Sequence, residues 1–237
     1  MGENVKGIVL LAIVLSGCGA SPESNNSSFD VTEQSVTQLG VAMVEGRVTA
    51  VGLVDSYFAR IEAYDQQGPN LNAMIVLNPL ARQEAAALDE ERASGQIRGP
   101  LHGVPVVVKD NYDTLGMPTT AGTIALATSM PPDDATQVKR LRDAGAVILG
   151  KTNMHELARG ITTIASYGGQ TRNPYNPRRN PGGSSGGTGA AVAASFAAFG
   201  MGSDTCGSIR IPSAHHALVG LRGTRGLASG DGIIPLS

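Results

Sequence analysis

What this sequence lacks excludes several classes of protein. Its 237 residues include only two cysteines, so no disulfide framework can form, and its cysteines and histidines do not have the spacing of a zinc site. No run of 18 apolar residues occurs, which argues against an ordinary transmembrane helix. The formal net charge is −2, with both signs dispersed along the chain, so no basic surface for nucleic acid is indicated.

The rest of the composition predicts one globular domain of alternating strands and helices. Hydrophobic residues make up 41% of the chain, which is enough for a sizeable core. Short apolar runs predict strands at 72–77, 104–108, 146–149 and 199–203. Apolar periodicity and capping residues predict helices within 35–63 (with a cap at Thr49), from Pro79 to Gly95, over 134–144, after a cap at Thr152 or Asn153, and over 188–198. This alternation predicts an α/β layered fold, with a long loop at 167–183.

The N-terminus has the pattern of a secretory leader. Lys6 precedes an apolar run over 8–15, which ends in Ser16-Gly17-Cys18. Eight apolar residues are too few to span a bilayer but suit the apolar region of a signal peptide, whereas the alternative, a buried strand, needs no such ending. The Leu-Ser-Gly-Cys segment resembles the bacterial lipobox. We therefore expect residues 1–18 to be a lipoprotein signal with lipidation at Cys18, residues 19–30 to be a flexible linker, and residues 31–237 to be the domain.

This leader implies a location. A lipidated Cys18 would anchor the protein in the bacterial cell envelope, and Gly19 in the next position favours the periplasmic side of the outer membrane. The second cysteine, Cys206, is then left unpaired. The four histidines, His102, His155, His215 and His216, are expected to form structural hydrogen bonds.

Three polar residues in apolar or glycine-rich settings suggest catalysis. Lys109 closes the run Val-Pro-Val-Val-Val, where burial favours the neutral amine, which is a base. Ser184 lies in Gly-Gly-Ser-Ser-Gly-Gly and Ser208 in Asp-Thr-Cys-Gly-Ser-Ile-Arg. Both segments are expected to be loops that the backbone of another segment can approach closely. Together they supply the groups of a serine–lysine hydrolase. The glycine-rich segment could instead cradle a phosphate, but it lacks the Gly-Lys-Ser/Thr ending of a P-loop.

Longer motifs around these residues resemble one family. They are Gly103-Val-Pro-Val-Val-Val-Lys-Asp-Asn111, Gly150-Lys-Thr-Asn153, Asn180-Pro-Gly-Gly-Ser-Ser-Gly-Gly187 and Gly202-Ser-Asp-Thr-Cys-Gly-Ser-Ile-Arg-Ile-Pro212. In this order they resemble the amidase signature family of serine hydrolases, over about Val36 to Ser237. The resemblance implies a mixed central β-sheet flanked by helices. Family members continue beyond the position of Ser237 into further strands and loops, so the domain is expected to be incomplete at its C-terminal end.

The resemblance also implies roles for individual residues. Ser208 corresponds to the nucleophile, Ser184 to a serine after a cis peptide bond that relays the proton, and Lys109 to the general base. The backbone N–H groups of Thr205, Cys206, Gly207 and Ser208 would form the oxyanion hole. Supporting roles are expected for Ser185, beside the Ser184 hydroxyl, and for an Asp204–Arg210 pair that holds the turn of the nucleophile; Asp110 and Asn111 are expected to orient the turn after the base.

These roles imply an enzyme that needs no metal or organic cofactor. It would hydrolyse a linear carboxamide, in a small molecule or a peptide, to an acid and ammonia or an amine through an acyl-serine intermediate. Two alternatives stay open: a protein similar to the A subunit of glutamyl-tRNA amidotransferase, and a truncated, inactive family member. The sequence decides neither which amide is the substrate nor the oligomeric state.

Overall fold

A mixed four-stranded sheet organises the computed structural model, which describes Met1 and residues 29–235. Its strands are β1 (Met74–Leu77), β2 (Pro105–Lys109), β3 (Val147–Thr152) and β6 (Gly200–Met201). The spatial order is β1-β3-β2-β6, in which β1 runs antiparallel to β3 while β3, β2 and β6 are parallel. The predicted mixed α/β architecture is therefore present.

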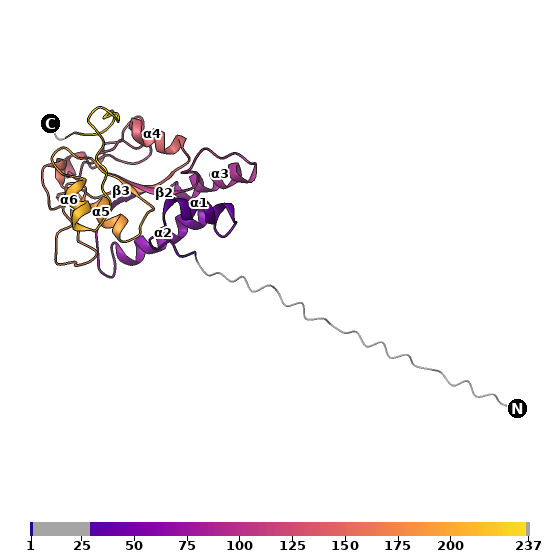
Figure 1. Cartoon of the computed structure of the whole chain (residues 1–237). Coiled ribbons are helices and arrows are strands. Elements are labelled where there is room, and N and C mark those ends of the chain that lie inside the picture. The colour runs from indigo at the N-terminus through magenta and orange to yellow at the C-terminus, as the bar shows by residue number, and fades with distance from the viewer. Residues whose placement is uncertain (2–28, 236–237) are drawn as a thin grey trace.

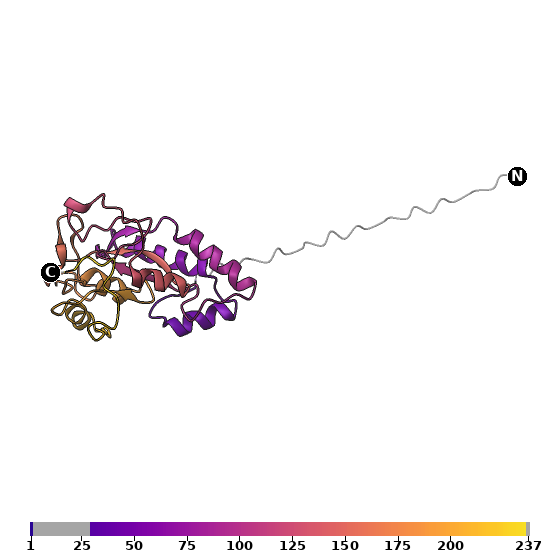
Figure 2. The same ribbon diagram turned by 90° about the horizontal axis from the view of Figure 1, so that it is seen from above.

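Helices cover both sides of this sheet. They are α1 (Val36–Val44), α2 (Ala50–Tyr64), α3 (Ala81–Ala93), α4 (Thr136–Asp143), α5 (Gly186–Ala193) and α6 (Arg210–His215). In Figure 1, α4 lies above strands β2 and β3, and α2 and α5 lie below them. Both views place the N-terminal helices at one end of the molecule and the orange and yellow C-terminal elements at the other (Figure 2). Two 3-10 turns (Ile124–Leu126 and Glu156–Ala158) and a small hairpin of β4 (Ile164–Ala165) and β5 (Gly169–Gln170) complete the fold.

The first helices begin where their capping residues stand. Ser35 and Gln38 form a capping box at the start of α1, and the Thr49 hydroxyl accepts from Gly52 N–H at the start of α2, as predicted. The carboxylate of Asp89, on α3, accepts from the first two N–H groups of α2 at 2.8 and 3.1 Å. The negative charge is favourable at this positive helix end, so Asp89 joins α3 to α2.

Strands β2 and β3 form the centre of the core, since every residue in both is buried. In their parallel register Lys109 pairs with Thr152, and Val108 pairs with Lys151. Side chains alternate between the two faces of a strand. Lys109 therefore lies on the face that packs against α5, where Thr152 meets Thr188 of that helix, and Lys151 lies on the opposite face.

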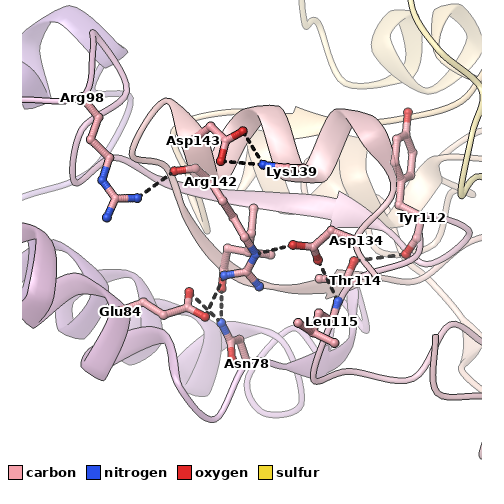
Figure 3. Close-up of polar contacts among 11 residues, drawn as sticks. Asn78, Glu84, Arg98, Tyr112, Thr114, Leu115, Asp134, Lys139, Arg142 and Asp143 are labelled. Atoms are coloured by element: carbon pink, nitrogen blue, oxygen red, sulfur yellow. Dashed lines mark hydrogen bonds and ion pairs between the residues drawn. The ribbon is translucent and has the colours of Figure 1, made fainter. Parts of the chain in front are cut away.

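A half-buried cluster of charges fastens α3 to α4 at the edge of the core (Figure 3). The Arg142 guanidinium lies 2.7 Å from the Glu84 carboxylate and 3.2 Å from that of Asp134. Asn78 donates to Glu84 and also to the carbonyl of Ile148 in β3, at 2.8 Å. Arg142 thus connects α4 to α3, and Asn78 connects Glu84 to the sheet, with each carboxylate partly shielded from water.

Some predicted elements differ from the structure. No α-helix follows Thr152 or Asn153: Asn153 Oδ1 accepts from Met154 N–H at 2.9 Å, and Leu157 has a φ of 51°, so only a 3-10 turn forms. Helix α5 begins at Gly186 and ends at Ala193, earlier than predicted at both ends. Helix α6 was not predicted, because six residues that include a proline show little periodicity.

The predicted leader with Cys18, and most of the linker, lie outside the described residues. Among the helices that the structure describes, none is long and apolar enough to cross a membrane. Three of the four histidines form the expected hydrogen bonds through their rings: a ring nitrogen of His102 lies 2.9 Å from the Leu88 carbonyl, and one of His216 lies 2.8 Å from the Pro212 carbonyl. His155 Nδ1 lies 3.4 Å from both the backbone nitrogen and the hydroxyl of Thr162.

Candidate active site

Lys109 lies fully buried at the carboxyl end of β2. Its Nζ is 2.7 Å from Ser184 Oγ, 2.9 Å from Ser203 Oγ and 3.5 Å from the Ser203 carbonyl. Burial lowers the pKa of Lys109 to about 7, although the negative charge of Asp204 opposes that shift. None of the ion pairs among the described residues includes Lys109. A neutral amine can donate to Ser203 and accept a proton from Ser184 at the same time.

Ser184 is held by the chain on both sides. A cis peptide bond joins it to Gly183, as the family resemblance implies. Its carbonyl accepts from His155 N–H at 3.0 Å, and its side chain is fully buried. The hydroxyl therefore meets Lys109 at a fixed point between the carboxyl end of β2 and the start of α5.

The glycines that follow Ser184 allow α5 to approach its neighbours closely. A Cβ atom at Gly186 would collide with the Thr163 side chain, and one at Gly187 with the Asn153 carbonyl. A Cβ at Gly189 would meet the ring of His216. Glycine is needed here because no side chain fits, rather than for flexibility.

The Asp204 carboxylate organises the turn that carries Ser208. It accepts from the N–H groups of Gly207, Ile209 and Arg210 at 2.7, 3.1 and 3.3 Å. The Arg210 guanidinium lies 3.0 Å from it, as predicted, and that of Arg222 lies 3.5 Å away. Burial favours the neutral acid, but the hydrogen bonds from Arg210 and from the backbone outweigh it and hold the pKa of Asp204 well below its usual range.

Ser208 lies beside this pair and is nearly buried. Its carbonyl accepts from Ser185 N–H at 3.2 Å, which joins the two serine loops. Among the described residues no hydrogen bond links the Ser184 and Ser208 hydroxyls. The relay predicted between them thus remains a prediction.

One of the four backbone N–H groups predicted to form the oxyanion hole already donates a hydrogen bond within the protein. The N–H of Gly207 donates to Asp204 Oδ1, so the expectation that it faces a substrate oxygen is not met in this structure. The N–H groups of Thr205, Cys206 and Ser208 donate to no acceptor within the part of the chain that the structure describes. The Cys206 thiol is free and exposed.

Ser203 is a site residue that the sequence analysis missed. Its hydroxyl accepts from Lys109 Nζ and from Asn111 Nδ2, the latter at 3.1 Å. Ser185, expected to support Ser184, donates instead to the Ser203 carbonyl at 3.2 Å. Asn111, expected to orient the turn after the base, does so by holding Ser203 and the Ile234 carbonyl. The signal for Ser203 was its place beside Asp204 in the Ser208 motif.

Lys151 was also missed. It lies fully buried near the end of β3, with Nζ 3.3 Å from Asp110 Oδ1, 3.1 Å from the Pro118 carbonyl and 3.2 Å from Thr119 Oγ1. Burial lowers its pKa, and the Asp110 carboxylate opposes that shift. The signal was available, since Lys151 follows the apolar run 146–149 much as Lys109 follows its own.

A cavity of about 850 Å³ adjoins the site. The residues that line it include Ser185, Ser203, Asp204 and Thr205, together with most of segment 218–230. Within the described part of the chain, no three histidine, cysteine, aspartate or glutamate side chains gather as a group that could hold a metal ion. The chemistry that the site offers is that of hydroxyls and a buried amine.

Comparison with protein families and curated proteins shows which family this chain resembles. Residues 52–237 match the family model described as Amidase. The A subunit of glutamyl-tRNA(Gln) amidotransferase from Thermobifida fusca is 46% identical over 206 residues, which cover 86% of this chain and 41% of that protein. A putative amidase from Schizosaccharomyces pombe is 43% identical over 222 residues, or 91% of this chain and 37% of that protein.

Solved structures give the same result. The peptide amidase from Stenotrophomonas maltophilia superposes with a TM-score of 0.85 at 49% identity, over 87% of this chain and 43% of that one. An amidase family protein from Bacillus anthracis superposes with a TM-score of 0.83 at 41% identity, over 87% and 42%. The chain thus spans less than half the length of these relatives.

Proposed function

This chain belongs to the amidase family, and we propose that it hydrolyses a linear carboxamide, in a small molecule or a peptide, to a carboxylic acid and ammonia or an amine. The observation that carries the proposal is the buried Lys109 amine, whose pKa is lowered to about 7 and whose Nζ lies 2.7 Å from Ser184 Oγ. With a pKa of about 7, a substantial fraction of this amine is neutral near pH 7 and can accept a proton from a serine relay.

In the proposed reaction Ser208 Oγ attacks the amide carbon. The Ser208 proton passes to Ser184 Oγ as the Ser184 proton passes to Lys109 Nζ, so one base serves two hydroxyls. N–H groups of the 205–208 turn stabilise the negative charge on the carbonyl oxygen. When the C–N bond breaks, the proton returns along the same path to the departing nitrogen. A water molecule, activated by the same relay, then hydrolyses the acyl-Ser208 ester.

Ammonia release from simple aryl, aliphatic and peptide C-terminal amides tests this proposal. The purified chain should release ammonia, and Ser208→Ala should lower kcat/KM by about 10³-fold or more while the protein stays folded. Ser56→Ala is the matched control, because the Ser56 hydroxyl only donates within α2. Equal turnover by wild type and Ser208→Ala would reject Ser208 as nucleophile. A folded wild type that turns over none of these amides would reject the activity for this chain.

A second candidate function follows from the similarity to glutamyl-tRNA amidotransferase A subunits. Such a protein would work with tRNA and other subunits. Turnover of a free amide by the purified chain alone, unchanged when tRNA is added, favours the amidase. Activity that depends on tRNA and partner subunits favours the second function. A third possibility, an inactive member, is rejected by any turnover that Ser208→Ala abolishes.

We further propose that Cys18 anchors the protein to the bacterial envelope. The apolar run before Ser16-Gly17-Cys18 supports this. Cells that express the full chain and receive radiolabelled palmitate should label the wild type, and Cys18→Ala should prevent labelling without affecting the domain. Absence of label in the wild type would reject the anchor and favour the tRNA-dependent function.

A further inference from the structure

Lys151 and Asp110 form an ion pair that the proposed reaction does not use. Both side chains are fully buried, and Lys151 Nζ lies 3.3 Å from Asp110 Oδ1. Burying two charges costs free energy unless they pair closely and their remaining donors and acceptors are bonded. Lys151 meets that condition with the Pro118 carbonyl and the Thr119 hydroxyl.

Asp110 connects this pair to Lys109. It is the next residue, and its carboxylate also accepts from the Thr120 hydroxyl and from Gly122 N–H, the latter at 3.2 Å. Its own N–H donates to the Thr152 carbonyl, and its carbonyl accepts from Ala121 N–H. The chain that leaves the base is therefore bonded on both sides to β3 and to segment 118–122, at the point where Lys109 turns toward the serines.

We propose that the Lys151–Asp110 pair positions Lys109 from the opposite face of the sheet and cancels a carboxylate charge that would otherwise keep the Lys109 amine protonated. This proposal rests on the proposed function, in which Lys109 is the base. Lys151 is thus a positioning residue, which acts through Asp110 and does not touch the reacting atoms. The pair contributes no net charge beside the base while both partners are charged.

The other charged groups near Lys109 are already paired. Asp204, on the segment after β6, is bound by Arg210 and Arg222. On the side of the sheet that faces Lys151, the charge of Asp113 also acts on this lysine. His155, which donates its backbone N–H to the Ser184 carbonyl, has its pKa lowered by partial burial, which favours the neutral ring. The Asp204 charge opposes the lowering of the Lys109 pKa, and on the opposite face of the sheet the balance of charge depends on Lys151 and Asp110.

Opposite shifts in the pH dependence of kcat/KM test the proposal. Activity requires neutral Lys109, so kcat/KM rises with pH through the pKa of that amine. Lys151→Met leaves the Asp110 carboxylate without its counter-ion, and the pH at which kcat/KM rises should increase by about one unit. Asp110→Asn leaves the Lys151 charge without its counter-ion, and the pH at which kcat/KM rises should decrease by a similar amount. The double variant should return close to the wild-type profile and, with no buried charge, is the variant best able to fold.

A direct titration of Lys109 separates failure of this inference from failure of the proposed function. The chain has four lysines, so ¹³Cε-labelled lysine gives four signals by nuclear magnetic resonance, and Lys109→Met identifies one of them. The Lys109 signal should titrate near pH 7 in the wild type, higher in Lys151→Met and lower in Asp110→Asn, whether or not amides are turned over. Lys139→Met removes an exposed pair with Asp143 and should shift nothing. Unchanged titration in both folded single variants would overturn the proposal.

Discussion

Lys109 and Lys151 lie on neighbouring parallel strands, equally buried, on opposite faces of one sheet. Lys151 has a carboxylate 3.3 Å away together with a carbonyl and a hydroxyl. Lys109 has two hydroxyls and a carbonyl but no carboxylate partner among the described residues. Burial lowers the pKa of both amines and an acid opposes each shift, but among the described residues only Lys151 lies within ion-pair distance of its acid, since Asp204 acts on Lys109 without such a contact. Whether a buried amine is an anchor or a base thus depends on one neighbouring acid.

The largest effect should come from removing the amine that lacks an acid. Lys109→Met should lower kcat/KM by about 10³- to 10⁴-fold, since the general base is lost. It should also raise Tm. In the folded protein the pKa of Lys109 is lowered to about 7. As the pH drops from about 10.5 toward 7, the unfolded chain takes up a proton on Lys109 that the folded protein does not, so the free energy of unfolding falls. Methionine cannot take up this proton and therefore removes the loss. Amide hydrolysis and thermal unfolding at pH 7 measure both; a lower Tm would contradict the comparison.

Removing the paired amine should have the opposite effect on stability. Lys151→Met leaves the buried Asp110 carboxylate without its counter-ion and should lower the free energy of unfolding by about 3–5 kcal/mol. Denaturant unfolding measures this loss. Adding Asp110→Asn should recover most of it, because the remaining charge is removed as well. If the double variant is as unstable as Lys151→Met alone, the loss comes from packing and not from charge.

His216 extends the comparison to a third buried base, which, like Lys109, forms no ion pair among the described residues. Its Nδ1 donates to the Pro212 carbonyl, Nε2 has no hydrogen-bond partner in the described part of the chain, and burial lowers the pKa of His216 to about 4. Stability should therefore be complete above about pH 6.5 and fall by up to about 2–3 kcal/mol as the pH drops toward 4, because only the unfolded chain takes up the proton. His216→Asn keeps a donor for Pro212 and should reduce the difference in Tm between pH 7 and pH 4.5. An unchanged difference would show that other groups cause it.

The smallest effect should come from a hydroxyl that orients the base. Ser203→Ala removes the acceptor 2.9 Å from Lys109 Nζ and should lower kcat about tenfold, with little change in Tm, since other groups still hold the amine. Ser203→Thr should restore most of the activity. Ser56→Ala serves as control. Loss of stability in proportion to activity would assign Ser203 a structural role only.

Elements with a strong local signal could be predicted from the sequence. The apolar runs that became β2 and β3 and the cap at Thr49 depend on neighbouring residues, and the structure has them where they were expected. Elements that depend on contacts between residues far apart in the sequence could not be predicted. The helix expected after Asn153 fails because the Asn153 side chain accepts from the next N–H and the chain turns away.

The candidate site divides in the same way, into residues that a local motif reveals and contacts that no local motif reveals. Lys109 and the serines could be found because each lies in a distinctive local motif. The Lys109–Ser203 contact joins residues 94 positions apart, and no local pattern reports it. For Lys151 the local signal was present, since a lysine after an apolar strand is expensive to bury in either case. What the sequence could not indicate was which lysine had an acid within reach.

The glycines that follow Ser184 limit which substitutions this protein can tolerate. Gly186, Gly187 and Gly189 each lie against another segment with no space for a methyl group, so these sites have no tolerated replacement, however conservative. Directed evolution of a new amide preference should therefore leave them out of the randomised library. Variation has to be sought in the wall of the adjoining cavity, which most of segment 218–230 lines together with Asp204 and Thr205.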